Sequence, residues 1–308
     1  MEIRQLQSLI KLINCNFSVS KAADEMFLVQ SAVSQHLKKL EDELGSDLFV
    51  RKGKRLIGLT PIGEQVAKHA QTTLASVNSI RAIGYDYINQ NEGVLRIGST
   101  HAQARYILPP VVKAFNAAYP RVELQIHQGT PKQLVQWAIG DEIDFSICTE
   151  ALAESSQLTN IPCYQWNRSL ITLPDHPLLV KQTLSLEDLC DYPIITYVYG
   201  FTGRRSFSDT FETAHLEPHV VLSAADTDVI KTYVRGGMGV GIIASMALDG
   251  DNDQGLVSRD MSHLFPWETT RIAYLNDKFL RQYQQKFIDL FLAYVHKSEN
   301  NKIKNLPV

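Results

Sequence analysis

Five polar side chains near the start of the chain have the types and spacing that reading DNA requires. They are Gln30, Ser31, Ser34, Gln35 and Lys38, and the last four share one face if the segment is helical. Hydroxyl, amide and ammonium groups can bond to base edges in the major groove, where each base pair displays its own pattern of donors and acceptors. We therefore predict that this set reads DNA.

Four cations follow within five residues. They are Arg51, Lys52, Lys54 and Arg55, and two short β-prone runs flank the Gly53 between them. This pattern is typical of a hairpin, or wing, whose cations would contact phosphates and add salt-dependent affinity. A polar helix face or a basic turn is often merely solvated when it occurs alone. Together and in this order, the two features predict DNA binding.

Helices must position these residues. The run 3–13 places Ile3, Leu6, Ile10 and Ile13 at helical spacing. Ser18 can cap a short second helix, whose Ala22 and Ala23 allow close packing. The third helix is expected to bury a stripe and to end at Gly45; the stripe is Val33, Leu37, Leu40 and Leu44. This arrangement predicts a helix-turn-helix.

A long helix is expected after the wing, because Thr60 can cap it and Pro61 suits its first position. Its apolar positions form a thin stripe along roughly seven turns, namely Ile62, Val66, Ala70, Val77, Ile80 and Tyr87. We interpret it as a linker that pairs with its copy in another subunit. The alternative is a helix that packs only on its own chain.

Composition limits the possible classes of protein. The chain has 308 residues, 44% hydrophobic and 20% charged, and a formal charge of -3, so two or three globular cores are expected and any DNA contact must come from a local patch. Neither a run of about 18 apolar residues nor a signal peptide is present, which predicts a cytoplasmic protein without membrane contact. Four scattered cysteines indicate buried thiols rather than disulfides or a metal site; they are Cys15, Cys148, Cys163 and Cys190.

From residue 93 onward, short β-rich runs alternate with helical segments. Examples are GVLRIGS, VELQIHQG, DFSIC, PIITYV and GVGIIA among the strands, and LPPVVKAFNAAY and DTDVIKTYVRGG among the helices. The alternation predicts an α/β domain with largely parallel sheet. About two hundred residues of this kind suggest two lobes that share a cleft.

Hydroxyl and amide side chains follow three of the expected strands. They are Ser99, Thr100 and Gln103 after the first, Thr149 after a second, and Thr202 after a third. Ligands of open α/β sheets bind beyond the carboxyl ends of strands, often at helix N-termini, so these groups favour a small anion such as sulfate or a carboxylate. Each threonine could instead simply cap a helix or turn.

The sequence disfavours two other classes of protein, an enzyme and a plain solute-binding protein. The sequence has no G-x-S-x-G elbow, P-loop, dinucleotide-binding glycine motif or H-E-x-x-H, and no readable pair of nucleophile and base. A plain solute-binding protein would not carry the N-terminal DNA-binding unit. We therefore expect neither catalysis nor a cofactor.

The runs AADEMFLVQSAVSQHLKKLEDELGSDLFVR and LTPIGE closely resemble the LysR-type transcriptional regulators. Further runs resemble the CysB and Cbl branch, the regulators of sulfur assimilation and sulfonate use; they include THAQARYILPPVVKAF, ITYVYGFTGR and SAADTDVIKTYV. The resemblance implies a homotetramer that binds promoter DNA and activates RNA polymerase. The implied effector is an acetylserine species, sulfate, thiosulfate or adenosine phosphosulfate.

Carried onto this sequence, the family's anion pocket comprises Thr100, Gln103, Thr149 and Thr202. Ala102 departs from the pattern, because this position is often Thr in CysB. One missing hydrogen bond to a charged ligand costs roughly 1.5 to 3 kcal/mol. Because of this departure, the assignment to CysB, to Cbl or to a further paralogue stays open. The alternative is a LysR-type regulator of another pathway that senses a different small carboxylate.

The expected architecture follows. Residues 1–60 form an all-α winged helix-turn-helix, residues 61–90 a linker and dimerisation helix, and residues 91–308 an α/β effector-binding domain with two lobes, like periplasmic binding proteins. Lobe I is expected over about 91–163 and 267–300, and lobe II over about 164–266.

Overall fold

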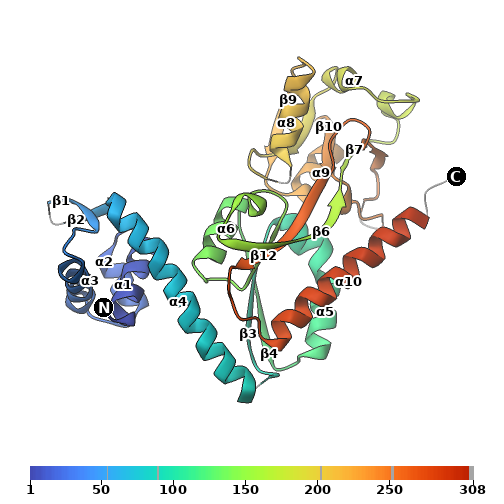
Figure 1. Ribbon diagram of the computed structural model, residues 1–308. Coiled ribbons are helices and arrows are strands. Elements are labelled where there is room, and N and C mark those ends of the chain that lie inside the picture. Colours follow the sequence, from blue (N-terminus) through green and yellow to red (C-terminus); the bar gives the residue numbers. More distant parts are fainter. Residues whose placement is uncertain (54, 89, 202, 251–252, 305–308) are drawn as a thin grey trace. The chain divides into compact units, whose positions relative to one another are not determined.

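The computed structural model describes residues 1–53, 55–88, 90–201, 203–250 and 253–304, with the side chains of 86–88 and 298–304 outside this description. The chain divides into two compact units (Figure 1). Met1–Ile88 and Asp277–Phe279 form the first, and Asn89–Asn276 with Leu280–Val308 form the second.

The first unit is a winged helix-turn-helix followed by a long helix. Its elements are α1 (Ile3–Asn14), α2 (Val19–Glu25), α3 (Gln30–Leu44), β1 (Phe49–Lys52), β2 (Arg55–Leu59) and α4 (Pro61–Ile88). Local signals in the sequence fix several boundaries. The Ser18 hydroxyl accepts the Lys21 N–H and caps α2, and the left-handed Gly45, at φ 64°, ends α3. Both predictions are confirmed.

The core of this unit lies where α1 contacts α2, α3 and α4. Leu9 and Leu12 of α1 are fully buried, although the predicted stripe omitted both. Two predicted stripe residues at helix ends, Ile3 and Leu44, are each 42% exposed. The prediction was wrong there because α1 packs on several sides, whereas the ends of α1 and α3 extend beyond the small core.

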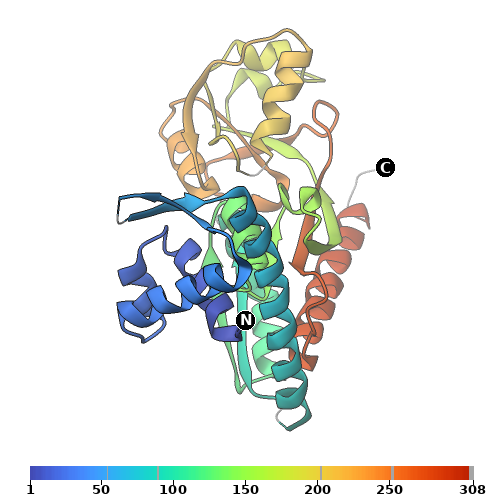
Figure 2. The same cartoon turned by 60° about the vertical axis from the view of Figure 1, so that its left-hand side comes forward.

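The wing is an antiparallel hairpin, seen as the blue ribbon pair in Figure 2. Phe49 pairs with Leu59 and Lys52 with Arg55, with a shift of register after Val50. At its foot, the Thr60 hydroxyl accepts the Gly63 N–H at 3.0 Å and so caps α4, as predicted.

The second unit contains two five-stranded sheets. The lobe I sheet has the strand order β4-β3-β5-β12-β6 and the lobe II sheet the order β11-β7-β10-β8-β9. Lobe I contains β3 (Gly93–Ser99), β4 (Val122–Gln128), β5 (Phe145–Cys148), β6 (Leu158–Trp166), β12 (Glu268–Leu275), α5 (Leu108–Ala118), α6 (Pro131–Ile139), α10 (Gln282–Lys304), a π-helical turn η1 (Gln103–Ile107) and a 3-10 turn η2 (Leu152–Glu154). Lobe II contains β7 (Arg168–Thr172), β8 (Ile194–Tyr197), β9 (Val220–Ala224), β10 (Val240–Ala244), β11 (Val257–Asp260), α7 (Leu186–Cys190), α8 (Arg204–Thr213), α9 (Thr227–Arg235) and two 3-10 turns, η3 (Pro177–Leu179) and η4 (Ser245–Ala247).

Aromatic packing holds α10 on lobe I. The Phe287 ring centroid lies 5.6 Å from that of Phe115 on α5 and 6.1 Å from that of Phe145 on β5. This contact places the last helix against residues that precede it by well over a hundred positions, and α10 continues as helix to Lys304.

The sheets are mixed, not largely parallel as predicted. β3 pairs in parallel with β4 and β5, and β8 with β9 and β10, but β12 and β7 run antiparallel to their neighbours. The reason is that β7 is the first strand after the chain enters lobe II and β12 the first after it returns to lobe I. Among the described residues, no α-helix immediately precedes either strand to return the chain for parallel pairing. β6 extends through Trp166, beyond the expected lobe limit near 163, and β7 begins the second sheet at Arg168.

Candidate functional site

The five predicted DNA-reading residues lie exposed on α3 or at its first position. Gln30, Ser31, Ser34, Gln35 and Lys38 are all exposed, whereas the opposite stripe is buried. Val33 and Leu40 on that stripe have no exposed surface. One helix therefore anchors in the core with one side and presents hydrogen-bonding groups to solvent with the other, as major-groove reading requires.

The three wing cations that the structure describes are also exposed, but one of them has an internal partner. Arg51 Nη2 lies 2.7 Å from Glu41 Oε2, and Glu41, only 8% exposed, also accepts the Leu48 N–H. Arg51 therefore fastens the wing to α3. Lys52 and Arg55 are exposed on the two strands, and Lys54 lies outside the described residues.

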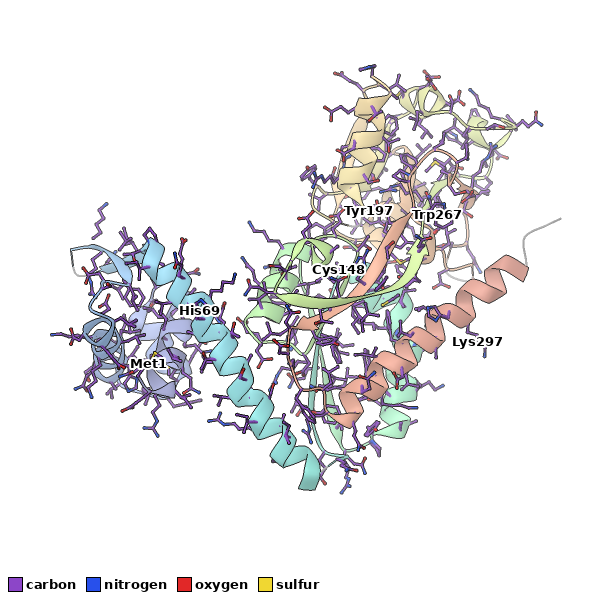
Figure 3. The ribbon with its side chains drawn as sticks, viewed as in Figure 1. Met1, His69, Cys148, Tyr197, Trp267 and Lys297 are labelled. Carbon is purple, nitrogen blue, oxygen red and sulfur yellow. The ribbon has the colours of Figure 1, made fainter. Side chains whose placement is uncertain are left out.

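The predicted effector residues lie where β3 and β5 end. Ser99, Thr100 and Gln103 are buried, with 0%, 6% and 1% of their surfaces exposed. Thr149 is half-buried directly after β5. Figure 3 labels Cys148 at the end of β5 and Tyr197 at the end of β8 in the other lobe. Ala102 is buried, and Thr202 lies outside the described residues.

Hydrogen bonds join two of these predicted residues through a third that the sequence interpretation missed. Thr270 Oγ1 on β12 accepts from Gln103 Nε2 at 3.3 Å and lies 3.2 Å from Thr149 Oγ1. Tyr164 OH donates to Gln103 Oε1, and Trp166 Nε1 donates to Thr149 Oγ1. These five side chains form one polar network, hereafter the polar network.

A buried arginine lies beside this network. Arg168 is 3% exposed, and its Nη2 donates to Gly203 O at 2.5 Å and to Glu268 Oε1 at 3.0 Å. Its guanidinium carbon lies 5.8 Å from the Trp166 ring centroid, within cation–π range. The sequence interpretation did not include this cation. The missed signal was the charge of Arg168 at the first position of β7, a strand whose five residues are all buried.

Glu150 brings a negative charge to the same region. Burial of its side chain, followed by the nearby Glu268 carboxylate, raises the pKa of Glu150, while the Gly203 N–H opposes the shift. Gly203 has a φ of 72°, and a β-carbon on it would collide with Arg168. Glycine therefore permits the close approach of α8 to these charged groups.

The buried atoms without a hydrogen-bond partner among the described residues include His101 Nδ1 and two donors, Ser99 Oγ and Arg168 Nη1. Buried polar groups are nearly always paired, so each such group calls for an explanation. Both could donate to an anion. The arrangement can thus hold a small anion by hydroxyl, amide and guanidinium groups.

A second set of contacts links the lobes away from the polar network. Tyr106 OH on η1 donates to Asp228 Oδ1 on α9 at 2.7 Å, and Arg105 Nε lies 3.5 Å from Asp228 Oδ2. Burial and the Asp228 carboxylate both raise the pKa of Tyr106. Tyr106 therefore stays a neutral donor across the pH range in which proteins fold.

Metal sites, disulfides and membrane-spanning helices were the other features to consider in the described part of the chain. No group of three or more His, Cys, Asp or Glu residues could hold a metal ion among the described residues. The four cysteines are free thiols, and burial raises the pKa of Cys148 most strongly. Over the same residues, every helix is too short or too polar to cross a bilayer.

Two family models match the chain. One, described as "Bacterial regulatory helix-turn-helix protein, lysR family", matches residues 3–64, and the other, "LysR substrate binding domain", matches residues 89–295. The chain belongs to the LysR family. As a LysR-family protein it is a DNA-binding transcriptional regulator rather than an enzyme, with an effector-binding domain of two lobes.

Individual proteins similar to this LysR-family chain are also transcriptional regulators. The transcriptional regulator CysB of Haemophilus influenzae is 41% identical over 99% of this chain and 97% of that protein. SsuR of Burkholderia cenocepacia is 40% identical over 97% of each. The solved cofactor-binding domain of the regulator Cbl matches with a TM-score of 0.64 and 37% identity, covering 68% of this chain and 94% of that one.

Proposed function

We propose that this chain controls genes of sulfur assimilation or cysteine biosynthesis by binding promoter DNA and a small anionic metabolite that reports sulfur status. Similarity to CysB and SsuR over almost the whole chain supports this pathway. It disfavours the alternative of a LysR-type regulator that senses an unrelated carboxylate. The protein acts in the cytoplasm, where it engages duplex promoter DNA and RNA polymerase.

One observation carries the effector proposal. Among the described residues, Ser99 Oγ and Arg168 Nη1 are buried donors without a hydrogen-bond partner. Ser99 ends β3 shortly before Gln103, and Arg168 lies beside Trp166, which donates to Thr149. A bound anion would satisfy such donors and offset the cost of burying the Arg168 charge. The proposed effector contacts are Ser99, Thr100, Gln103, Thr149 and Thr202, and Ala102 contributes no hydroxyl.

On the DNA side, Ser34, Gln35 and Lys38 enter the major groove, with Gln30 and Ser31 at the start of the same helix. Arg55, Lys52 and Lys54 contact phosphates, and Arg51 shares its charge between Glu41 and the backbone of DNA. This division is supported by the exposure of the described residues and by the pairing of Arg51 with Glu41 on α3.

Coupling between effector and DNA passes through the oligomer. α4 exposes Ile80, Ile83 and Tyr85 at 70%, 52% and 55%, which supports pairing of this helix with a second copy. The effector closes the cleft, changes how the subunits of a homodimer or homotetramer sit together, and so alters DNA bending. A ligand can shift this equilibrium only by binding the two states with different affinity.

Calorimetry on the full chain tests the effector. Acetylserine, sulfate, thiosulfate, adenosine phosphosulfate and an aromatic acid are titrated separately into the wild type and into Thr149→Val. We expect at least one sulfur-containing anion to bind and the variant to lose roughly tenfold or more in affinity. Thr213→Val is the matched control, because Thr213 is exposed at the end of α8.

The proposal fails if only the aromatic acid binds, or if Thr149→Val and Thr213→Val retain the same affinity for every sulfur-containing anion.

A further inference from the structure

The turn between α2 and α3 exposes three consecutive apolar residues, Phe27, Leu28 and Val29, hereafter the apolar turn. Phe27 is 95% exposed, Leu28 38% and Val29 67%. The neighbouring Met26 packs against the core of the unit, so the core does not lack apolar groups at this point. Such exposed apolar surface weakens a soluble fold unless something covers it.

The backbone of the apolar turn is held in a defined shape. The Phe27 N–H donates to Asp24 O at 3.1 Å and the Leu28 N–H to Ala23 O at 2.9 Å, which is the Schellman pattern at the end of a helix. This pattern places Phe27 in the left-handed region with a φ of 54°. Glycine or asparagine adopts that conformation readily, whereas a bulky aromatic residue does so with strain. Because 95% of the Phe27 surface is exposed, packing of the ring compensates little for this strain.

A second local rule is broken at the start of α3. Val29 is its N-cap and makes no side-chain cap, although Ser, Thr, Asp and Asn are strongly preferred there because they bond the free N–H groups of the first turn. Ser18 shows this preference at the start of α2. Strain and broken local rules concentrate at functional sites, where they are kept for a purpose other than stability.

The purpose follows from where the apolar turn lies. Val29 directly precedes Gln30 and Ser31, and in helix-turn-helix proteins the N-terminal residues of the second helix contact base edges. The C5-methyl group of thymine is the apolar feature of the major groove. We propose that Val29 and Phe27 read thymine methyl groups, adding apolar readout to the polar contacts of α3. The inference rests on the proposed DNA-binding function.

A defined chemical change in the DNA tests the proposal. The probe is a short duplex selected by the full-length chain from a random-sequence library, in which single thymines are replaced by deoxyuridine. Deoxyuridine lacks only the methyl group and keeps every hydrogen bond of the pair. We expect replacement at one or two positions of each half-site to weaken binding of the wild-type chain roughly fourfold per methyl.

Two variants connect this loss to the apolar turn. Val29→Ser restores a capping hydroxyl, and Phe27→Asn suits the left-handed backbone, so both should fold at least as well as the wild type. Each variant should bind the thymine duplex more weakly and should lose the thymine–deoxyuridine difference at the position that the replaced residue reads. Val180→Ser is the matched control, because Val180 is an 87% exposed valine in lobe II. It should keep the full discrimination.

Three results would overturn the inference. Salt-dependent binding by the wild type with no thymine–deoxyuridine difference would remove it and leave the proposed DNA-binding function standing. If the variants lose the same affinity for the thymine duplex as for the deoxyuridine duplex, the apolar turn positions α3 without reading methyl groups. If the variants still discriminate between the duplexes but sediment with a different mass from the wild type, a second copy of the chain covers the apolar turn instead.

Discussion

Glu41 of α3 and Arg51 of β1 form an ion pair, with 2.7 Å between Oε2 and Nη2. The other carboxylate oxygen of Glu41 accepts the buried Leu48 N–H at 2.9 Å. The same carboxylate thus binds both the connection to the wing and the wing itself. It fixes the position of the phosphate-contacting strands relative to the helix that carries the base-reading residues.

Glu41→Ala should therefore destabilise the first unit. The substitution leaves the Leu48 N–H buried without an acceptor, which costs about 1 to 3 kcal/mol. Urea unfolding of the full chain measures the loss. Glu43→Ala is the control, because Glu43 pairs with the N-terminal amine at the surface and such pairs contribute less than about 1 kcal/mol. Equal effects of the two substitutions would show that Glu41 has no structural role.

Arg55→Ala should weaken binding to all DNA sequences alike. Arg55 is exposed on β2, so its charge is available to a phosphate. The slope of log affinity against log salt should fall by about one. Arg51→Ala should lower the slope less, because part of its charge is already neutralised by Glu41. Fluorescence anisotropy over a range of salt concentrations compares the variants, and a larger change for Arg51→Ala would contradict this assignment.

Gln35 substitutions should alter sequence preference. A side-chain amide in the major groove discriminates between bases, and its loss costs roughly 1 to 3 kcal/mol at the position it reads. Selection of duplexes by the wild type and by Gln35→Ala should give consensus sequences that differ at one position in each half-site. Identical consensus sequences, with a uniform loss of affinity, would assign Gln35 to the phosphates instead.

Glu150 should make the stability of the effector domain depend on pH. Because the pKa of Glu150 in the folded chain lies above its usual value, the folded state holds the proton more tightly than the unfolded state. Stability contributed by this group is then lost as the pH rises from the usual pKa through the raised one. Glu150→Gln keeps an acceptor for the Gly203 N–H and removes the charge.

Thermal unfolding of wild type and Glu150→Gln across acidic to neutral pH isolates this effect. The variant should be more stable at neutral pH, and the difference should shrink as the pH falls below the raised pKa. A variant that is less stable at neutral pH would mean that the Glu150 carboxylate is stabilised by Arg168 and Gly203 more than burial penalises it.

Local signals in the sequence predicted the DNA-binding unit well, because its boundaries depend on neighbouring residues. Ser18, Gly45 and Thr60 act on backbone groups a few positions away, and each lies where it was expected. The exposed ends of α1 and α3 were missed, because the size of the core depends on how helices meet in space.

The effector region was only partly predictable. The positions of Ser99, Gln103 and Thr149 at or just after strand ends were predicted correctly, because β3 and β5 are clear in the sequence. β6, which carries Tyr164 and Trp166, was missed because Pro162 interrupts its pattern. The structure accommodates Pro162 opposite the register shift between Thr270 and Arg271, on a strand at the edge of the sheet. Thr270 joins the site only through pairing of strands that are distant in the chain.

Binding of the full chain to a promoter duplex as a function of salt concentration tests the central claim most directly. If the first sixty residues read DNA through α3 and the basic wing, the logarithm of the affinity should fall linearly as the logarithm of the salt concentration rises. The affinity of Arg55→Ala should fall less steeply than that of the wild type. Binding that is absent at low salt, or that does not change with salt, would contradict the account.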